Sequence, residues 1–173
     1  MGKAKAYQVV VEQMIIRFKK GKHQWKHKPD TLTCVRDDGT VTWTHLHSGF
    51  VHHDFAHYVV ETTLGFENAF FGLVAKGYDI PDFSEPKTTR PFEIPREAMN
   101  TEPIVSLLQA EVLDGGTDRE GVFRDHDTSL SVSVTDAQLG LMRQKMWELL
   151  ERWHNLQPGA SMTLQFIVSP KNK

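Results

Sequence analysis

The sequence is poor in cysteine, having only Cys34 among its 173 residues. A single cysteine excludes an intrachain disulfide and also excludes a zinc site built from several thiolates. A chain of this length buries enough apolar surface to fold without such crosslinks. We therefore expect a single domain over residues 1–173, in a reducing compartment, with Cys34 buried as a small hydrophobic side chain.

Long apolar runs are also missing, since no stretch reaches the ~18 to 20 residues of a membrane-spanning helix. The N-terminal run MGKAKAYQVVVEQMIIRFKK is interrupted by Glu12 and Gln13 and is followed by no small-residue cleavage site, which argues against a signal peptide. Ala6 stands where a myristoylation signal has Ser or Thr. The sequence predicts a soluble, cytoplasmic protein without a membrane partner.

Net charge is small, at −2, and this argues against a nucleic-acid partner, which normally requires a broad basic surface. One segment is different: FKKGKHQWKHK, Phe18 to Lys28, has five lysines and two histidines around Trp25. Such a segment suits an anion or a nucleic-acid backbone. The simpler interpretation, which we favour, is a solvated connection between two strands.

Strand patterns occupy both ends of the chain. Tyr7–Phe18 is rich in β-branched residues and apolar on both faces, as expected of an inner strand. Thr31–His47 reads as a hairpin because Asp38-Gly39 supplies the turn, with Val41, Trp43, His45 and His47 on one face of its second arm. Ser161–Val168 alternates and predicts a strand, and SLSVSVT, residues 129–135, predicts a further short one.

Helical patterns lie between these strands. They run from about His52 to Gly65, through ENAFFGLVAKG to Gly77, and through TEPIVSLLQAEVLDGG with Thr101 as the expected cap. Thr135 and Gln138 form a capping-box pattern that opens the longest helix. We therefore predict an α+β fold, in which the N-terminal strand, the hairpin and the C-terminal strand form an antiparallel sheet with helices on one face.

Histidine is concentrated in THLHSGFVHHDFAHYVVE, Thr44–Glu61, which holds five of the nine histidines. On a helix, His53 and His57 are one turn apart, so both rings can reach one ion at ~2 Å per bond. Glu61 lies one turn beyond His57, where a carboxylate would orient that ring and raise its basicity. Asp54 takes the place of the general base in HExxH metalloproteases.

Further ligands are expected from His45 and His47, because an HxH pair on a strand directs both rings to one side and only five residues separate His47 from His53. His126 is a more distant candidate. Nitrogen ligands without thiolates favour zinc or another divalent transition metal. The alternative is that these histidines pack and hydrogen-bond without metal.

Two segments, HHDFAHYVVETTLGFENAFFGLVAKG and WHNLQPGASMTLQF, resemble a group of small uncharacterised bacterial proteins. That group has an HDxxHxxVE helix, a GFxG-type segment with an aromatic residue before the glycine, and a terminal W, L, P-G and alternating-strand signature. The matching residues are His53, Asp54, His57, Val60 and Glu61, then Gly65, Phe70, Phe71 and Gly72, then Trp153, Leu156, Pro158 and Gly159. The resemblance implies that the helix is a unit, although His52 stands where the group favours proline; it implies no known activity.

Two functions of different classes follow. In the first, the protein is a metal-dependent hydrolase of an unknown small substrate, in which Asp54 accepts a proton from metal-bound water, Glu61 steadies His57, and the segment 79–95 shapes the substrate entrance. In the second, it is a non-enzymatic binding or assembly module. Phe70, Phe71 and the doubly apolar first strand would then contact a protein partner or a second copy in a homo-oligomer.

Overall fold

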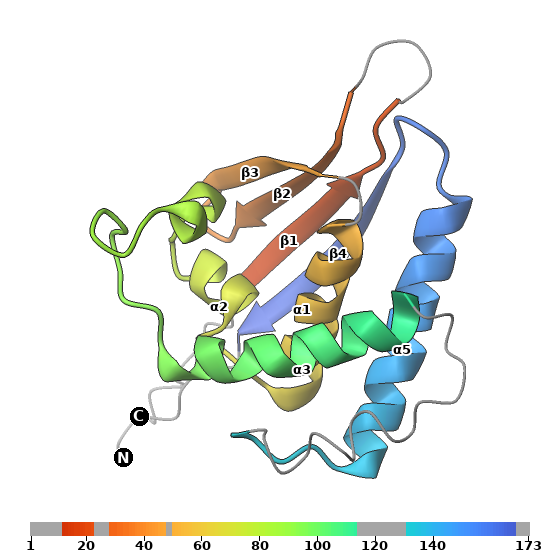
Figure 1. The fold of residues 1–173 in the computed structure, drawn as a ribbon. Helices are drawn as coiled ribbons and strands as arrows, with labels where there is room; N and C mark the ends of the chain where they lie inside the picture. Colours follow the sequence, from red (N-terminus) through yellow and green to blue (C-terminus); the bar gives the residue numbers. More distant parts are fainter. Residues whose placement is uncertain (1–11, 23–27, 48–49, 114–130, 169–173) are drawn as a thin grey trace, which may run out of the picture.

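The computed structural model describes residues 12–22, 28–47, 50–113 and 131–168. Three strands come first along the chain, the helices follow them, and the fourth strand comes last (Figure 1). In chain order the elements are β1 (Glu12–Lys19), β2 (Asp30–Arg36), β3 (Val41–Leu46), α1 (Phe50–Leu64), α2 (Phe70–Ala75), the 3-10 helix η1 (Ile80–Ser84), α3 (Arg96–Leu113), α5 (Asp136–Asn155) and β4 (Ser161–Val168).

The four strands form one antiparallel sheet in the order β3-β2-β1-β4. Strand β1 is an inner strand, with Ile16 opposite Cys34 of β2 on one side and Leu164 of β4 on the other. The two ends of the described chain therefore pair with each other, with β4 at one edge of the sheet. This arrangement confirms the predicted α+β fold and its antiparallel sheet.

Helices cover one face of the sheet (Figure 1). Alternation along β1 places Met14, Ile16 and Phe18 in the core beneath them. Helix α1 touches the sheet through Phe55, whose ring lies 4.8 Å from that of Phe18, and touches α5 through Phe55 and Trp153. With α3 on a further side, α1 is enclosed by packed elements, and its buried residues include Asp54, His57 and Glu61.

Two predictions of local structure were wrong. Helix α3 begins at Arg96, so Thr101 is a buried residue within it, where its hydroxyl donates to the Glu97 carbonyl at 2.8 Å. The helix continues through Pro103 because its apolar face packs against the core and outweighs the cost of a missing N–H. Residues 131–134 form no strand; Val132 and Val134 contact the core from an irregular segment, and residues 129 and 130 lie outside the described residues.

The predicted caps agree with the structure. Thr135 and Gln138 form the capping box that opens α5. Gly65 and Gly77 follow α1 and α2 with φ of 70° and 108°, a backbone conformation that glycine adopts without steric cost. Cys34 is buried, and this burial raises the pKa of its thiol to about 12.

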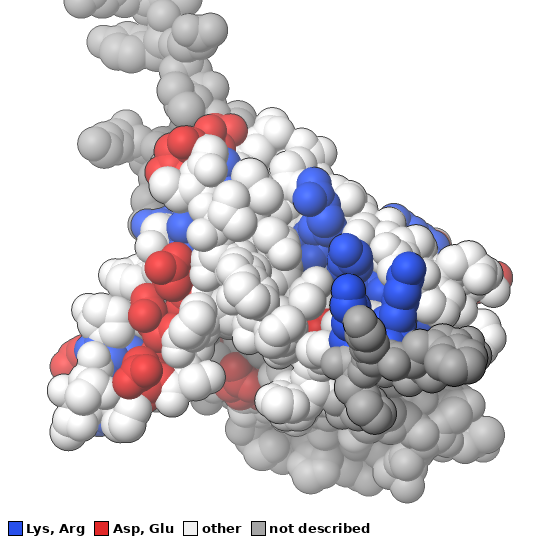
Figure 2. All heavy atoms as spheres, turned by 90° about the horizontal axis from the view of Figure 1, so that it is seen from above, with Lys and Arg blue, Asp and Glu red and all other residues white. Residues whose placement is uncertain are grey.

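The basic segment connects β1 to β2, as predicted, and the bridge between Lys22 and Lys28 continues the pairing of these strands. Residues 23–27 lie outside the described residues. Lys20 is structural, because its ammonium donates to the carbonyls of Trp153 and His154 at the end of α5. Basic side chains gather on one side of the molecule when it is viewed from above (Figure 2). No described helix is long and apolar enough to span a membrane.

Helix α5 offers a matched test of this core. Met142 is fully buried and its neighbour Leu141 is 43% exposed. We expect Met142→Ala to lower the free energy of unfolding by about 2–5 kcal/mol, because it leaves a cavity. Leu141→Ala should change it by no more than about 0.5 kcal/mol. Equilibrium urea unfolding measures both, and equal losses would contradict the described packing of α5.

Candidate metal centre

A pocket of about 470 Å³ lies beside the first half of α1. Its walls come from β3, η1, α2 and α3 as well as from α1. His53, Asp54 and His57 line it from α1, and Glu102 lines it from α3. We call it the histidine pocket.

Three side chains in the histidine pocket converge on one point. Ligand atoms of His53, His57 and Glu102 all lie within 4.8 Å of one another. The two Nε2 atoms are 3.2 Å apart, and His57 Nε2 is 3.4 Å from Glu102 Oε1. Donor atoms in a tetrahedral zinc site, each ~2.0–2.1 Å from the ion, are separated by ~3.3 Å. The spacing of these atoms therefore fits a divalent ion, and the residues could hold one.

The outer nitrogen of each ring faces an oxygen acceptor. His53 Nδ1 lies 3.1 Å from Gln109 Oε1, and His57 Nδ1 lies 3.3 Å from Glu61 Oε1. The second contact is an ion-pair distance without the alignment of a hydrogen bond. Both acceptors can take a proton from Nδ1. The contact between the two Nε2 atoms then needs a proton on one of them, and loss of that proton would leave both Nε2 atoms free to bind a metal.

Besides approaching His57, the Glu61 carboxylate caps the N-terminus of helix α2. It accepts from the backbone N–H groups of Phe71 at 3.2 Å and Gly72 at 3.0 Å, while the residue that precedes the helix, Ala69, supplies no capping side chain. A Cβ on Gly72 would lie 2.3 Å from the Glu67 carbonyl oxygen, so only glycine fits there. One buried carboxylate thus fixes both α2 and the ring of His57.

Charge at the centre is set by His57 and its two carboxylates. Burial alone would lower the pKa of His57, but Glu102 and Glu61 outweigh it and raise this pKa to about 9. Burial lowers the pKa of His53, and the neighbouring His57 lowers it further. Without metal at neutral pH, His57 is therefore an imidazolium between two carboxylates, and a metal ion must displace its proton.

Asp54 is the remaining buried acid of the histidine pocket. It has no hydrogen-bond partner in the described part of the chain, and burial raises its pKa to about 7. A carboxyl group with a pKa near the working pH is suited to general acid or base catalysis.

The predicted strand ligands do not join the group. Leu46 of β3 points into the core, so His45 projects from the opposite face, where it is exposed and touches the ring of Trp43. His47 lies past the end of β3 against Phe50. Both residues border the histidine pocket, but Glu102 supplies the third ligand atom. His126 lies outside the described residues.

Glu102 was missed because the helix was expected to begin at Thr101, which made Glu102 an ordinary acid of its first turn. The feature of the sequence that could have indicated Glu102 is its spacing of seven residues from Gln109. Seven residues are two helical turns, so both side chains share one face of α3. On that face Glu102 reaches His57 and Gln109 reaches His53.

Buried Arg36 holds the wall of the histidine pocket in place. Its guanidinium donates to the carbonyls of Val74 and Tyr78, each at 2.6 Å, and to Asp79 Oδ1 at 2.8 Å. The N–H of Ile80 donates to the Thr42 hydroxyl at 3.0 Å. These bonds attach the start of the segment 79–95 to the sheet, and residues of that segment line the pocket as predicted.

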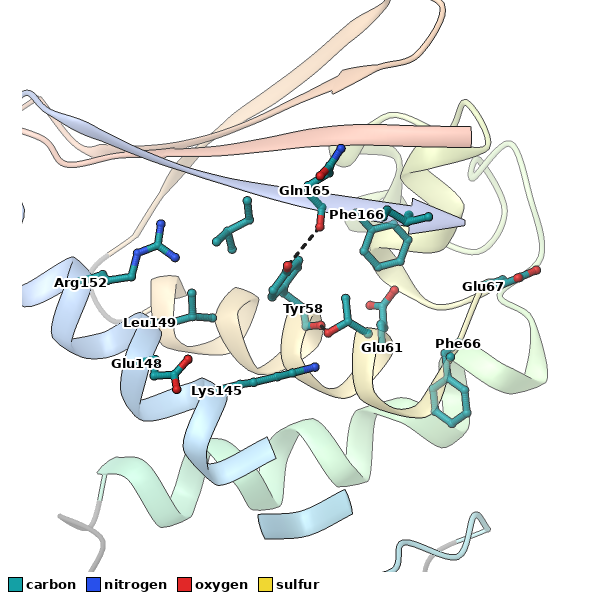
Figure 3. A pocket seen from close by; sticks show the side chains of 14 residues that line it. Tyr58, Glu61, Phe66, Glu67, Lys145, Glu148, Leu149, Arg152, Gln165 and Phe166 are labelled. Carbon is teal, nitrogen blue, oxygen red and sulfur yellow. Dashed lines mark hydrogen bonds between the residues drawn. The ribbon is translucent and has the colours of Figure 1, made fainter. Parts of the chain in front are cut away.

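A second cavity, of about 450 Å³, lies between α1, α5 and β4 (Figure 3). Tyr58 crosses it to donate to the Gln165 carbonyl at 3.1 Å. Lys145 and Arg152 line it from α5, and Glu61 borders it from α1. This cavity differs from the histidine pocket in having cationic side chains and no group of metal ligands among its described residues.

No family model, curated protein or solved structure matches the chain. The resemblance to the small bacterial proteins with an HDxxHxxVE helix stays a prediction. The interpretation of the histidine pocket accordingly depends on its geometry and chemistry.

The pKa of Asp54 gives a pH-dependent test on protein kept metal-free with a chelator. Folding raises this pKa from 3.8 to about 7, so the carboxyl favours the folded state below pH ~4 and loses that contribution progressively up to pH ~7. The Asp54→Asn variant has no carboxyl group to ionise at this position. Its free energy of unfolding relative to that of wild type should therefore rise by roughly 3 kcal/mol as the pH increases from 4.5 to 8. Urea unfolding at both pH values measures the difference, and a pH-independent difference would contradict the raised pKa.

Proposed function

We propose that the histidine pocket is a zinc centre, held by His53 Nε2, His57 Nε2 and a Glu102 oxygen, and that it hydrolyses a small ester, amide or similar bond. The main support is that both Nε2 atoms converge with a Glu102 oxygen while both Nδ1 atoms face acceptors. Two imidazoles and one carboxylate are a ligand set that catalytic zinc uses, and they leave a coordination position for water or substrate.

The same ligand set also binds Fe(II), in the two-histidine, one-carboxylate arrangement of oxygenases. Zinc is the better choice here because a carboxyl group stands beside the ligands. Asp54 lines the same pocket, lacks a partner in the described chain, and has its pKa raised to about 7. Hydrolysis needs such a proton acceptor.

Each residue has a separate role in this proposal. A bound zinc ion would supply a Lewis acid and make a coordinated water more acidic. Asp54 would serve as the proton acceptor in the pocket. Glu61 keeps His57 in the required tautomer, and Gln109 does the same for His53.

Metal uptake tests the centre directly. Protein purified without a nickel column, stripped and offered zinc should bind one equivalent, measured by elemental analysis after gel filtration. His57→Ala and Glu102→Gln should each lose this zinc, because three ligands are few enough that every one is needed. His154→Ala, which removes an exposed histidine of α5, should keep it. Wild-type protein that takes up no zinc would refute the proposal, and preferential uptake of iron would replace its hydrolytic part.

A second candidate is the assembly module, which a different surface supports. Phe71 is buried and Phe70 is half-buried where it lines the histidine pocket, so these two rings offer little exposed surface. Three of the eight exposed large hydrophobic residues of the described chain lie instead on the sheet face away from the helices. Val41, Trp43 and Ile167 are each 53% exposed there. Two copies could bury these faces against each other about a twofold axis.

Sedimentation velocity from 1 to 100 μM tests this candidate. If the sheet face joins two copies, wild type should dimerise with increasing concentration and Trp43→Glu should remain monomeric, because a buried unpaired carboxylate is costly. Trp147→Glu is the matched control, since Trp147 is 47% exposed on α5 and lies on a helix away from that face. A wild-type monomer at every concentration would exclude the homodimer.

A further inference from the structure

We infer that the histidine pocket selects uncharged substrates with an apolar, preferably aromatic, group next to the bond that reacts, and that it rejects anions. This inference rests on the proposed zinc centre and adds the substrate class. It depends on the charges that line the pocket, on its exposed apolar rim and on the aromatic wall that begins at His57.

The charges exclude anionic substrates. None of the described residues that line the histidine pocket is a lysine or an arginine, whereas Asp54 and Glu102 are acids. A phosphate ester or a dicarboxylate would meet these carboxylates without a lysine or an arginine to pair with. The second cavity shows the contrast, because Lys145 and Arg152 line it.

The rim of the pocket is apolar and exposed. Phe50, Ile94 and Met99 come from three separate segments and are 54%, 38% and 56% exposed. They are three of the eight large hydrophobic residues that the described chain leaves exposed. Apolar side chains that converge on one opening gain free energy when a ligand covers them.

An aromatic wall leads from the ligands to this rim. The ring of Phe70 lies 5.4 Å from that of His57, and the ring of Phe83 lies 4.9 Å from that of Phe70. Aromatic pairs at such separations favour a further ring beside them. The wall begins at a proposed ligand, so the apolar group of the substrate must lie within a few bonds of the reacting carbonyl. A pocket of about 470 Å³ accommodates a single ring with a short chain.

Hydroxamates test this selectivity because their head group binds zinc and their tail can be varied. On zinc-loaded protein, phenylacetohydroxamate should bind at least about tenfold more tightly than acetohydroxamate, from the apolar surface its ring buries. A hydroxamate of similar length ending in a carboxylate should bind no better than acetohydroxamate. Isothermal titration gives all three dissociation constants. Equal affinities for the phenyl and methyl probes, or tight binding of the anionic one, would overturn the inference.

Variants locate the effect within the pocket. Phe83→Ala should weaken phenylacetohydroxamate several-fold and leave acetohydroxamate unchanged. Phe66→Ala removes a ring from the second cavity and should change neither. Met99→Lys places a cation at the exposed rim and should tighten the anionic probe, which keeps the test decisive if Phe83→Ala fails to fold. No change in either variant would overturn the assignment to this pocket.

Failure of the zinc centre gives a different result. Metal-free protein titrated with neutral phenylacetamide, followed by the NMR shifts of its histidine ring protons, reports the pocket without zinc. Binding that Phe83→Ala weakens, in a protein that takes up no zinc, would refute the hydrolase and retain the selectivity. Absence of binding to both the zinc-loaded and the metal-free protein would overturn the inference itself.

Discussion

The enclosure of α1 is the constraint on which the rest of the structure depends. This helix packs against the sheet through Phe55, against α5 through Trp153 and against α3 through the contact of His53 with Gln109. Polar groups on such a helix lose water on folding and must find partners in the protein. His57 finds two carboxylates, and Glu61 finds two peptide N–H groups. The polar residues of α1 therefore determine how α2 and α3 pack around it.

Glu61 connects this requirement to the candidate centre. Its carboxylate caps α2 with one set of lone pairs and approaches His57 with another, so the position of α2 and the orientation of the ring are fixed together. Arg36 holds the other end of α2 through the Val74 carbonyl. A short helix held at both ends is a rigid support for Phe70, which forms part of the pocket wall. Precise placement of neighbouring groups is what a metal or catalytic site requires of its scaffold.

The relative positions of residues within one helix could be predicted from the sequence, whereas the packing of one helix against another could not. His53, His57 and Glu61 lie at successive turns of α1, so helical geometry alone predicts their order and spacing. Glu102 enters the group only because α3 packs across α1, and no local pattern encodes that packing. The antiparallel sheet was predictable for a similar reason, since alternation and turn chemistry are local properties.

The hairpin shows how tertiary contacts override a local pattern. Alternation places Val41, Trp43 and His45 on one face of β3, and His45 is predicted to offer a metal ligand from that face. The structure buries the other face, which holds Thr42 and Leu46. Thr42 accepts from the N–H of Ile80, and Arg36 at the end of β2 bonds the same region, so the polar residues face inward where these partners lie. His45 therefore lies outside the group of His53, His57 and Glu102, and Trp43 is exposed.

The carboxylates around His57 explain why the centre requires a positive charge. Glu61 is fully enclosed and Glu102, which is half exposed, lies on the other side of the same ring, so their repulsion and the lost hydration of Glu61 must be offset locally. A proton on His57 offsets them in part, and this is the cause of its raised pKa. A proton binds one nitrogen only and leaves His53 as a neutral neighbour 3.2 Å away. A divalent ion carries more charge and could engage both nitrogens and a Glu102 oxygen together, so it would offset the same acids more fully than the proton does.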